Sequence, residues 1–401
     1  MRITAVGDIA LTRTIGPRYE SEGSSVIEKR LQERLSVSDL LIANIECPLT
    51  DRTQPAWQHF STIKASQRSA DLLTDIGVDV GSLANNHIWD YGSEGLKDTI
   101  TALEERRIKW LGAGCSLQEA RRPLKYRHEG LVFGFLAAAQ PEVSAAGDKR
   151  GGASVLSDRW LKGAVKKLAS EADVTIVLLH FGIEFFEYPT PRQIQLCRGL
   201  IDNGALLVLG HHPHVPQAFE HYRGGFIAYS LGNFIFDMSP GPHRFSRLGL
   251  VVEAELKGNR LDRVEILPVD TRSGFPVMLS QGALKEANNY LRVRNHVLSD
   301  SSLLHQKYYF ACRDNLVVHM KALMNYGLRR MSFRRIVTWT QSQFWPQIMR
   351  LRIDFAKFLF SGKAAVFETQ KKRPQVSSVT RLWLYFCRIV GKFGNLYSAI
   401  I

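Results

Sequence analysis

Over the first 210 residues, strand-like apolar runs alternate with helix-like amphipathic windows, and this alternation constrains the fold more than any other feature. The predicted strands are 2–6, 39–45, 78–83, 131–138, 173–179 and 205–209. The predicted helices are 66–75, 93–106, 157–170 and 191–203, and several begin with Ser or Pro and end near Gly. This order is typical of βα units built around a largely parallel sheet.

The pattern changes after residue 210. Three further strands, 226–231, 248–256 and 261–269, follow without helices between them, and the second ends at a Lys-Gly-Asn turn. They predict an antiparallel meander. We therefore expect an α/β domain over residues 1–275 and a mostly helical extension over 276–401.

The positive charge is concentrated in the extension. Residues 281–401 hold 20 Lys and Arg against 5 Asp and Glu, whereas the first 280 residues hold 32 against 33. The extension therefore favours an anionic partner such as a membrane surface or an acidic polymer. Nucleic acid is disfavoured because no nucleic-acid-binding motif accompanies the charge.

Aromatic residues interleave with the arginines of the extension, among them Trp339, Trp345 and Trp383. This pattern fits interfacial membrane helices, and it fits equally a helical subdomain packed on the first domain or on a protein partner. The chain has no signal-peptide pattern after Met1 and no uncharged apolar run of 18 residues. Its five cysteines form no disulfide or zinc motif. We expect a cytoplasmic protein, with a peripheral location at the inner face of the membrane as the alternative.

Polar residues gather just beyond the carboxyl ends of the predicted strands, where ligands bind in α/β sheets. Six clusters share this position: Gly7-Asp8, Asn44-Ile45-Glu46, Ala84-Asn85-Asn86-His87, His180-Phe181-Gly182-Ile183-Glu184, Gly210-His211-His212-Pro213-His214 and Ser230-Leu231-Gly232-Asn233-Phe234. Because these strand ends meet at one edge, we expect their side chains to converge on a single site.

Imidazoles and carboxylates together form a ligand set for zinc, manganese or iron, and two histidines at i and i+2 can reach one metal or adjacent metals. Each residue alone has a structural explanation. Asp8 could cap a helix, Asn86 could form a turn, His180 could be a buried histidine and Glu184 a surface acid. Three histidines in four residues after an apolar run favour a site.

The ordered motifs resemble those of the CapA family, the proteins named for poly-γ-glutamate capsule synthesis. The matching segments are Gly7-Asp8, ANIECPLT at 43–50, SLANNHIWDYG at 82–92, LHFGIEF at 179–185, GHHPHVPQ at 210–217 and YSLGNFIFD at 229–237. That family is similar in fold to the calcineurin-like metallophosphoesterases. The resemblance therefore implies a four-layer α/β/β/α sandwich with a basic, helical C-terminal extension outside the match.

The resemblance also implies roles for individual residues. One or two divalent transition metal ions (Mn, Fe or Zn) would be held by Asp8, Glu46, Asn86, His180, His212 and His214. Glu46 would stand where the superfamily places a bridging Asp, and His87 would act as the acid toward the leaving group. The expected reaction is hydrolysis of a phosphoester, in the making or handling of an anionic polymer.

Two departures from the superfamily pattern keep alternatives open. Asp8 is followed by Ile9-Ala10, where the superfamily has Asp-x-His, and Glu46 replaces an Asp. Without metal, Asp8, Glu46, Glu184 and the histidines could act as acids and bases on a peptide-like substrate. A third hypothesis is a non-catalytic scaffold that binds the polymer at the inner face of the membrane.

Overall fold

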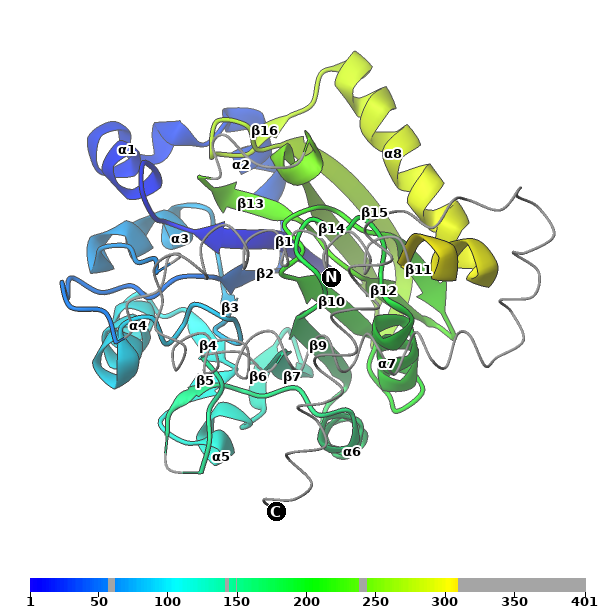
Figure 1. The fold of residues 1–401 in the computed structure, drawn as a ribbon, viewed down its shortest axis with the longest axis horizontal. Coiled ribbons are helices and arrows are strands. Elements are labelled where there is room, and N and C mark those ends of the chain that lie inside the picture. Colours follow the sequence, from blue (N-terminus) through cyan, green and yellow to red (C-terminus); the bar gives the residue numbers. More distant parts are fainter. Residues whose placement is uncertain (57–61, 141–143, 149, 238–243, 309–401) are drawn as a thin grey trace, which may run out of the picture. The chain divides into compact units, whose positions relative to one another are not determined.

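The computed structural model describes residues 1–56, 62–140, 144–148, 150–237 and 244–308 (Figure 1). The predictions for 309–401, including the membrane-facing aromatic residues and most of the basic charge, lie outside the described residues. The division of the chain at residue 275 therefore stays a prediction.

The helices and strands lie close to where the sequence pattern predicts them. The α-helices are α1 (Ile15–Glu22), α2 (Lys29–Leu35), α3 (Asp71–Asp75), α4 (Gly92–Glu105), α5 (Leu117–Ala120), α6 (Asp158–Ala169), α7 (Pro191–Ile201) and α8 (Gln281–Ser299). The strands are β1 (Arg2–Ala10), β2 (Leu40–Ile45), β3 (Val80–Ser82), β4 (Lys109–Leu111), β5 (Ala113–Gly114), β6 (Leu124–His128), β7 (Leu131–Ala139), β8 (Gly152–Ala153), β9 (Val174–His180), β10 (Leu207–His211), β11 (Phe219–Tyr222), β12 (Gly225–Ala228), β13 (Asn233–Phe236), β14 (Leu248–Lys257), β15 (Arg260–Asp270) and β16 (Val277–Met278).

Two large sheets form the centre of the described fold. The first has the order β16-β15-β14-β1-β2-β3-β4, with β13 also paired to β1. The second has the order β11-β12-β10-β9-β7-β6. The strands β1, β2, β3 and β4 run parallel, and so do β7, β9, β10 and β12. The carboxyl ends of these strands carry the predicted polar clusters.

The second sheet buries both of its faces, because alternate side chains of a strand point in opposite directions. Ile176 and Leu178 of β9 pack in the core that also contains the first sheet. Val177 and Leu179 pack with Leu161 of α6 and other residues of α6 and α7. In Figure 1, α1 to α4 lie on one side of the two sheets and α6 and α7 on the other. The predicted four-layer α/β/β/α sandwich is confirmed.

The predicted three-stranded meander is wrong in its first strand. The segment predicted as 226–231 contains β12, which pairs parallel with β10 and antiparallel with β11 in the second sheet. Of the three predicted meander strands, the second and third correspond to β14 and β15, which form an antiparallel hairpin in the first sheet. The chain crosses between the sheets after Ala228, and β13 then pairs parallel with β1. This crossing is decided by register between distant strands, which local alternation does not contain.

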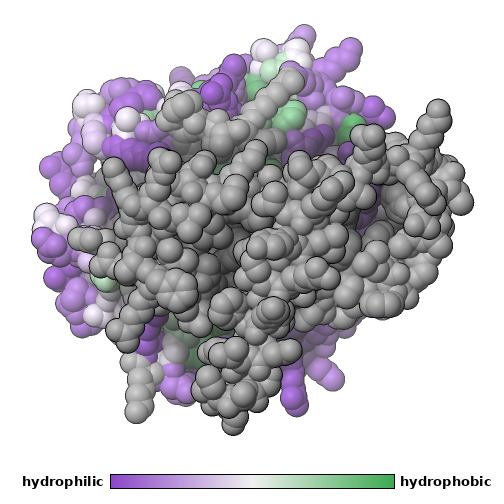
Figure 2. Space-filling model, in the orientation of Figure 1, coloured by the Kyte–Doolittle hydropathy of each residue, from purple (hydrophilic) through white to green (hydrophobic). Residues whose placement is uncertain are grey.

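The described surface offers few large apolar side chains to solvent. Val37, Val277 and Val293 are its exposed large hydrophobic residues. Figure 2 shows mostly hydrophilic residues among the coloured atoms along the rim of the face in view. None of the described helices has the length and apolar character that crossing a bilayer requires.

Candidate metal centre

Asp8 lies near the end of β1, at the junction of three strands. Its Cα pairs with Asn44 of β2 on one side and with Asn233 of β13 on the other. The backbone N–H of Asp8 donates to the Gly232 carbonyl at 2.9 Å. Gly7 permits this junction, since a Cβ there would lie 2.1 Å from the same carbonyl oxygen. The Asp8 side chain is fully buried and reaches the second sheet.

Side chains from both sheets meet the Asp8 carboxylate. Asn44 Nδ2 donates to Asp8 Oδ1 at 2.8 Å, and His211 Nδ1 lies 3.0 Å from the same oxygen. The backbone N–H of His212 donates to Asp8 Oδ2 at 3.2 Å, and His214 Nδ1 lies 3.7 Å away. Asp8 thus joins the end of β1 to the histidine loop that follows β10.

Glu46 follows β2 and is likewise fully buried. Its backbone N–H donates to the Ile9 carbonyl at 2.7 Å. Glu46 Oε1 lies 3.7 Å from His180 Nε2 and also 3.7 Å from His214 Nε2. One carboxylate oxygen therefore stands between two imidazoles that come from different strand ends.

His180, at the end of β9, links three of the predicted ligands. Its Nε2 lies 2.9 Å from Asn86 Oδ1 and 3.1 Å from His212 Nδ1. Its Nδ1 lies 3.3 Å from Asn44 Nδ2. His180 is 3% exposed, while Asn86 is half-buried. Asn86, His180 and His212 thus form a group next to Glu46.

The histidine loop after β10 has unusual backbone geometry. His212 has φ of 96° and His214 has φ of 57°, a region that few residues other than glycine adopt. His214 Nδ1 lies 2.9 Å from Asn233 Oδ1, which fixes its ring. The turn thereby directs both imidazoles inward. Gly210 allows the close contact before it, since a Cβ there would lie 2.0 Å from the Tyr229 carbonyl oxygen.

The electrostatics of the cluster keep Asp8 charged and keep His180 and His214 neutral. Burial alone would raise the pKa of Asp8, but the hydrogen bond with His211 and the nearby imidazoles lower it well below its ordinary value. Burial lowers the pKa of His180 far below 6.5, and the His212 imidazole acts in the same direction. Burial likewise lowers the pKa of His214. Ionised carboxylates and neutral imidazoles are the forms that bind metal ions.

The donor set fits a divalent metal ion. Asp8, Glu46 and His214 each offer one ligand atom, and these atoms lie within 4.8 Å of one another with all three residues buried. The second group, Asn86, His180 and His212, adjoins the same Glu46 oxygen. Mixed oxygen and imidazole donors suit zinc, manganese or iron. All six predicted metal ligands are brought together, and their binding of metal stays a prediction.

His87 and Glu184, two of the predicted catalytic residues, lie at the rim. His87 Nδ1 lies 2.9 Å from Asp90 Oδ2, and Asp90 also accepts the backbone N–H of Ile63 at 2.9 Å. The contact with Asp90 orients the His87 ring. His87 is half-buried, so part of it remains exposed to solvent. Glu184 is exposed. Burial lowers the pKa of His214, and the Glu184 charge opposes this with a smaller effect.

Three residues of the cluster are not among the metal ligands predicted from sequence. Asn44, His211 and Asn233 hold the side chains of Asp8, His180 and His214 in place. All three belong to the strand-end clusters, so their position in the sequence was a usable signal. Their contacts with the predicted metal ligands depend on how β1 pairs with β2 and β13, which the sequence pattern does not show.

The whole chain was compared with families of known proteins. The family model described as "Bacterial capsule synthesis protein PGA_cap" matches residues 2–238. The chain belongs to this family. The match includes β1 to β13 and every residue of the cluster, so the family shares the part of the fold that carries the candidate site.

Curated relatives extend the likeness across most of the chain. The "PGA biosynthesis protein CapA" of Bacillus subtilis is 31% identical over 285 residues, covering 70% of this chain and 74% of the relative. The "Capsule biosynthesis protein CapA" of Bacillus anthracis is 30% identical over 285 residues, covering 69% of each chain. The resemblance to the CapA family is confirmed.

The solved structures similar to this one are more distant. A putative 5'-nucleotidase from Staphylococcus aureus is 14% identical, with a TM-score of 0.43, covering 72% of this chain and 58% of that one. A likeness at this level says nothing about the reaction of the family member described here.

Proposed function

We propose that this protein is a metal-dependent hydrolase of phosphoester type that acts in the synthesis or handling of poly-γ-glutamate or a similar anionic polymer. The polymer follows from the printed names of the curated relatives, which are capsule and PGA biosynthesis proteins. The cluster supports a dependence on metal, and the phosphoester reaction rests on the resemblance of its residues to the metallophosphoesterase pattern. The role of the basic extension stays a prediction.

The observation that carries the proposal is the position of Glu46. Its Oε1 atom lies at the same 3.7 Å from His180 Nε2 and from His214 Nε2, in a fully buried setting. Asp8 adjoins His214, and Asn86 and His212 adjoin His180. Two donor groups thus share one carboxylate, which is the arrangement that a pair of neighbouring metal ions requires.

The buried acidic side chains of the cluster favour the binding of a cation. Two buried carboxylates, Asp8 and Glu46, stand among imidazoles of which His180 and His214 have lowered pKa values and stay neutral near pH 7. An unbalanced charge in a low-dielectric interior is costly, and a bound cation offsets it. The metal-free alternative requires a proton donor inside the cluster, and the low pKa values of Asp8 and His180 do not favour one.

Different residues of the cluster would bind the metal and donate the proton. Asp8, Glu46, Asn86, His180, His212 and His214 would hold the metal. When bound, a divalent ion supplies Lewis acidity toward a phosphoryl oxygen and activates water as a nucleophile. His87, oriented by Asp90, would place its free ring nitrogen toward the leaving group and donate a proton there.

The test is elemental analysis of untagged protein after reconstitution with Mn²⁺, Fe²⁺ or Zn²⁺, together with turnover of p-nitrophenyl phosphate and its diester. We expect bound metal in the parent, lost in the His212→Ala, His214→Ala double variant, and turnover that a chelator abolishes. A His128→Ala, His221→Ala double variant is the matched control, since these histidines lie on β6 and β11. A protein that stays metal-free after reconstitution, or turnover that resists the chelator, would overturn the proposal.

A further inference from the structure

The loop between β9 and α7 contains a strained aromatic residue beside the cluster. Phe185 has φ of 60°, in the left-handed region that bulky side chains avoid. Its side chain is half-buried. A backbone held in this region persists only where neighbouring structure enforces it, and such positions are concentrated at functional sites.

Hydrogen bonds from the histidine loop enforce this conformation. The backbone N–H of Phe185 donates to the Pro213 carbonyl at 2.8 Å. Gln217 Nε2 donates to the carbonyls of Phe186 at 2.8 Å and of Tyr188 at 3.0 Å. The loop that carries Phe185 is therefore attached to the turn that carries His212 and His214.

Helix α8 holds the same loop from the other side. Arg294 of α8 donates to Glu187, and its guanidinium lies 3.5 Å from the centre of the Tyr290 ring and 5.5 Å from that of Tyr188. Tyr290 donates in turn to the Pro216 carbonyl at 2.7 Å. One helix thus fixes both loops at once, and Phe185 has little freedom to move away from the cluster.

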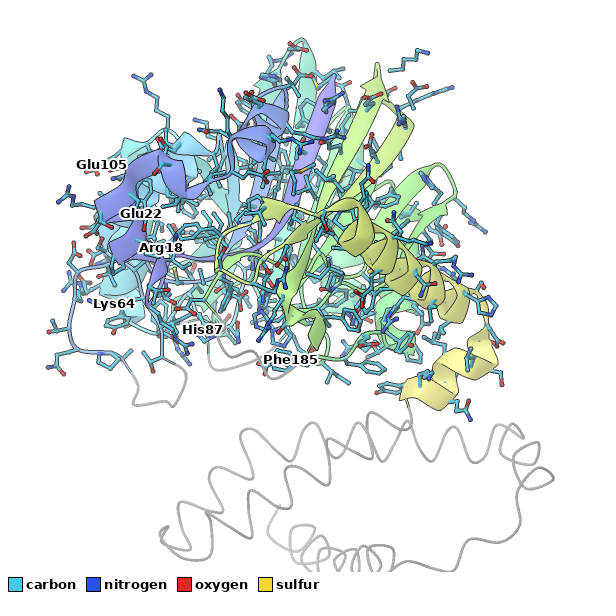
Figure 3. All side chains as sticks on the ribbon, turned by 90° about the horizontal axis from the view of Figure 1, so that it is seen from above. Arg18, Glu22, Lys64, His87, Glu105 and Phe185 are labelled. Carbon is cyan, nitrogen blue, oxygen red and sulfur yellow. The ribbon has the colours of Figure 1, made fainter. Side chains whose placement is uncertain are left out.

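The ring of Phe185 lies next to a metal-ligand candidate. Its centre is 5.9 Å from that of His214, and Phe236 lies 5.0 Å from the same imidazole. In Figure 3, Phe185 and His87 lie at the same edge of the described body. The candidate centre therefore combines charged donors with an aromatic ring that is only partly buried.

We propose that Phe185 is a specificity-determining residue, whose ring contacts the methylene groups of an anionic polymer while the polymer's anionic groups face the metal-binding side chains. This inference rests on the function proposed above. A γ-linked glutamate chain alternates carboxylates with short methylene runs, so it presents both kinds of group. Apolar contact with the ring would distinguish it from anions that have no methylene groups.

The experiment compares two anionic ligands on the full-length, metal-loaded protein by titration calorimetry. One is a γ-linked glutamate pentamer, and the other is inorganic phosphate, which carries charge without methylene groups. For Phe185→Gly we expect the pentamer Kd to rise about tenfold, equivalent to roughly 1.4 kcal/mol, with the phosphate Kd changed less than about twofold. Phe185→Leu, which keeps an apolar side chain, should recover most of the pentamer affinity.

Arg107→Gly is the matched control, because Arg107 has the same φ of 60° in an exposed turn after α4. It relieves similar backbone strain and should leave both Kd values unchanged. An unchanged pentamer Kd in Phe185→Gly, an equal loss for both ligands, or a parent that does not bind the pentamer would overturn the inference. Metal content and phosphoester turnover judge the proposed function separately, since neither measures recognition of the pentamer.

Discussion

Two buried glutamates, one within a strand of the first sheet and one just after the end of a strand, have different neighbouring side chains. Glu253, on β14, is 3% exposed and receives two hydrogen bonds from Arg34, at 2.7 and 3.0 Å. Glu46, after β2, is fully buried with imidazoles at 3.7 Å. Arg34 is always charged and neutralises Glu253 permanently. Glu46 is surrounded by groups that bind metal when neutral.

The difference separates a stabilising pair from a functional centre. A buried acid with an arginine partner needs no other ion, and removing either member costs stability. A buried acid among imidazoles has no permanently charged partner, and a bound cation can take that place. The comparison predicts opposite responses when each glutamate is replaced by the isosteric glutamine.

The largest effect is expected for Glu46→Gln. Because the shared carboxylate would be lost, metal affinity should fall by at least about 100-fold and phosphoester turnover by about 1,000-fold. The metal-free variant should be more stable than the metal-free parent by about 1–3 kcal/mol, since a fully buried acid is replaced by a neutral amide. Urea unfolding with and without metal checks both.

The parent supplies the internal control for this change. Metal at about 100 times its Kd should stabilise the parent by roughly 2.7 kcal/mol and leave Glu46→Gln unaffected. A metal-free Glu46→Gln protein less stable than the metal-free parent would mean that Glu46 is held by the fold as Glu253 is.

The sequence contains the clusters but not the contacts within them. Asp8, Glu46, His180 and His214 could be predicted because each follows an apolar run whose period identifies a buried strand. Asn44 and Asn233 could not be assigned, because their roles depend on the register at which β2 and β13 flank β1. The same limit made the predicted meander wrong, since β12 joins the second sheet by pairing with β10.

Backbone geometry accounts for the rest. Nothing in the composition of the loop after β9 indicates that Phe185 has a positive φ, because that conformation is imposed by Pro213. Nor does local pattern show that α8 holds this loop through Arg294 and Glu187, which are 107 residues apart. Such contacts follow from the tertiary fold rather than from propensity.

The second prediction concerns the pH dependence of the metal-free protein. Buried His180 and His214 have lowered pKa values and stay neutral in the folded state, while the unfolded chain takes up protons near pH 6.5. The unfolded state therefore binds more protons below that pH, and stability falls as the pH falls, by up to about 1.4 kcal/mol per pH unit for each histidine.

A second loss should follow below about pH 3.8, where unfolded Asp8 takes up a proton and folded Asp8, with its lowered pKa, does not. Urea unfolding in chelator from pH 7.5 to 5 measures the first loss. The His180→Gln, His214→Gln double variant should flatten it. A slope that persists in this variant would place the proton uptake outside the cluster.

The third prediction reverses the first. Glu253→Gln should lower the free energy of unfolding by about 1–3 kcal/mol, a range reduced because Arg34 is one-third exposed. Metal content and turnover should match the parent. Glu255→Gln is the control on the same strand, since Glu255 itself is 39% exposed in its pair with Arg2, against 3% for Glu253, and its loss should cost less than about 0.5 kcal/mol. A loss of metal in Glu253→Gln would show that Glu253 also affects metal binding, and would contradict the distinction between the two glutamates.

The smallest effect tests a carboxylate between these extremes. Asp90 is half-buried and contacts one imidazole, His87, at 2.9 Å. Ile63 N–H and His87 Nδ1 both contact Asp90 Oδ2, so the amide oxygen of Asp90→Asn can still accept from both, but the negative charge that strengthens the contact with His87 is lost. If Asp90 orients the proton donor, kcat should fall about tenfold with KM and bound metal unchanged. The control is Asp98→Asn in helix α4, which weakens the contact of Asp98 with Arg52 and should leave kcat within about twofold of the parent. A loss of metal in Asp90→Asn would make Asp90 part of the centre, whereas an unchanged kcat would leave His87 without the role that its geometry indicates.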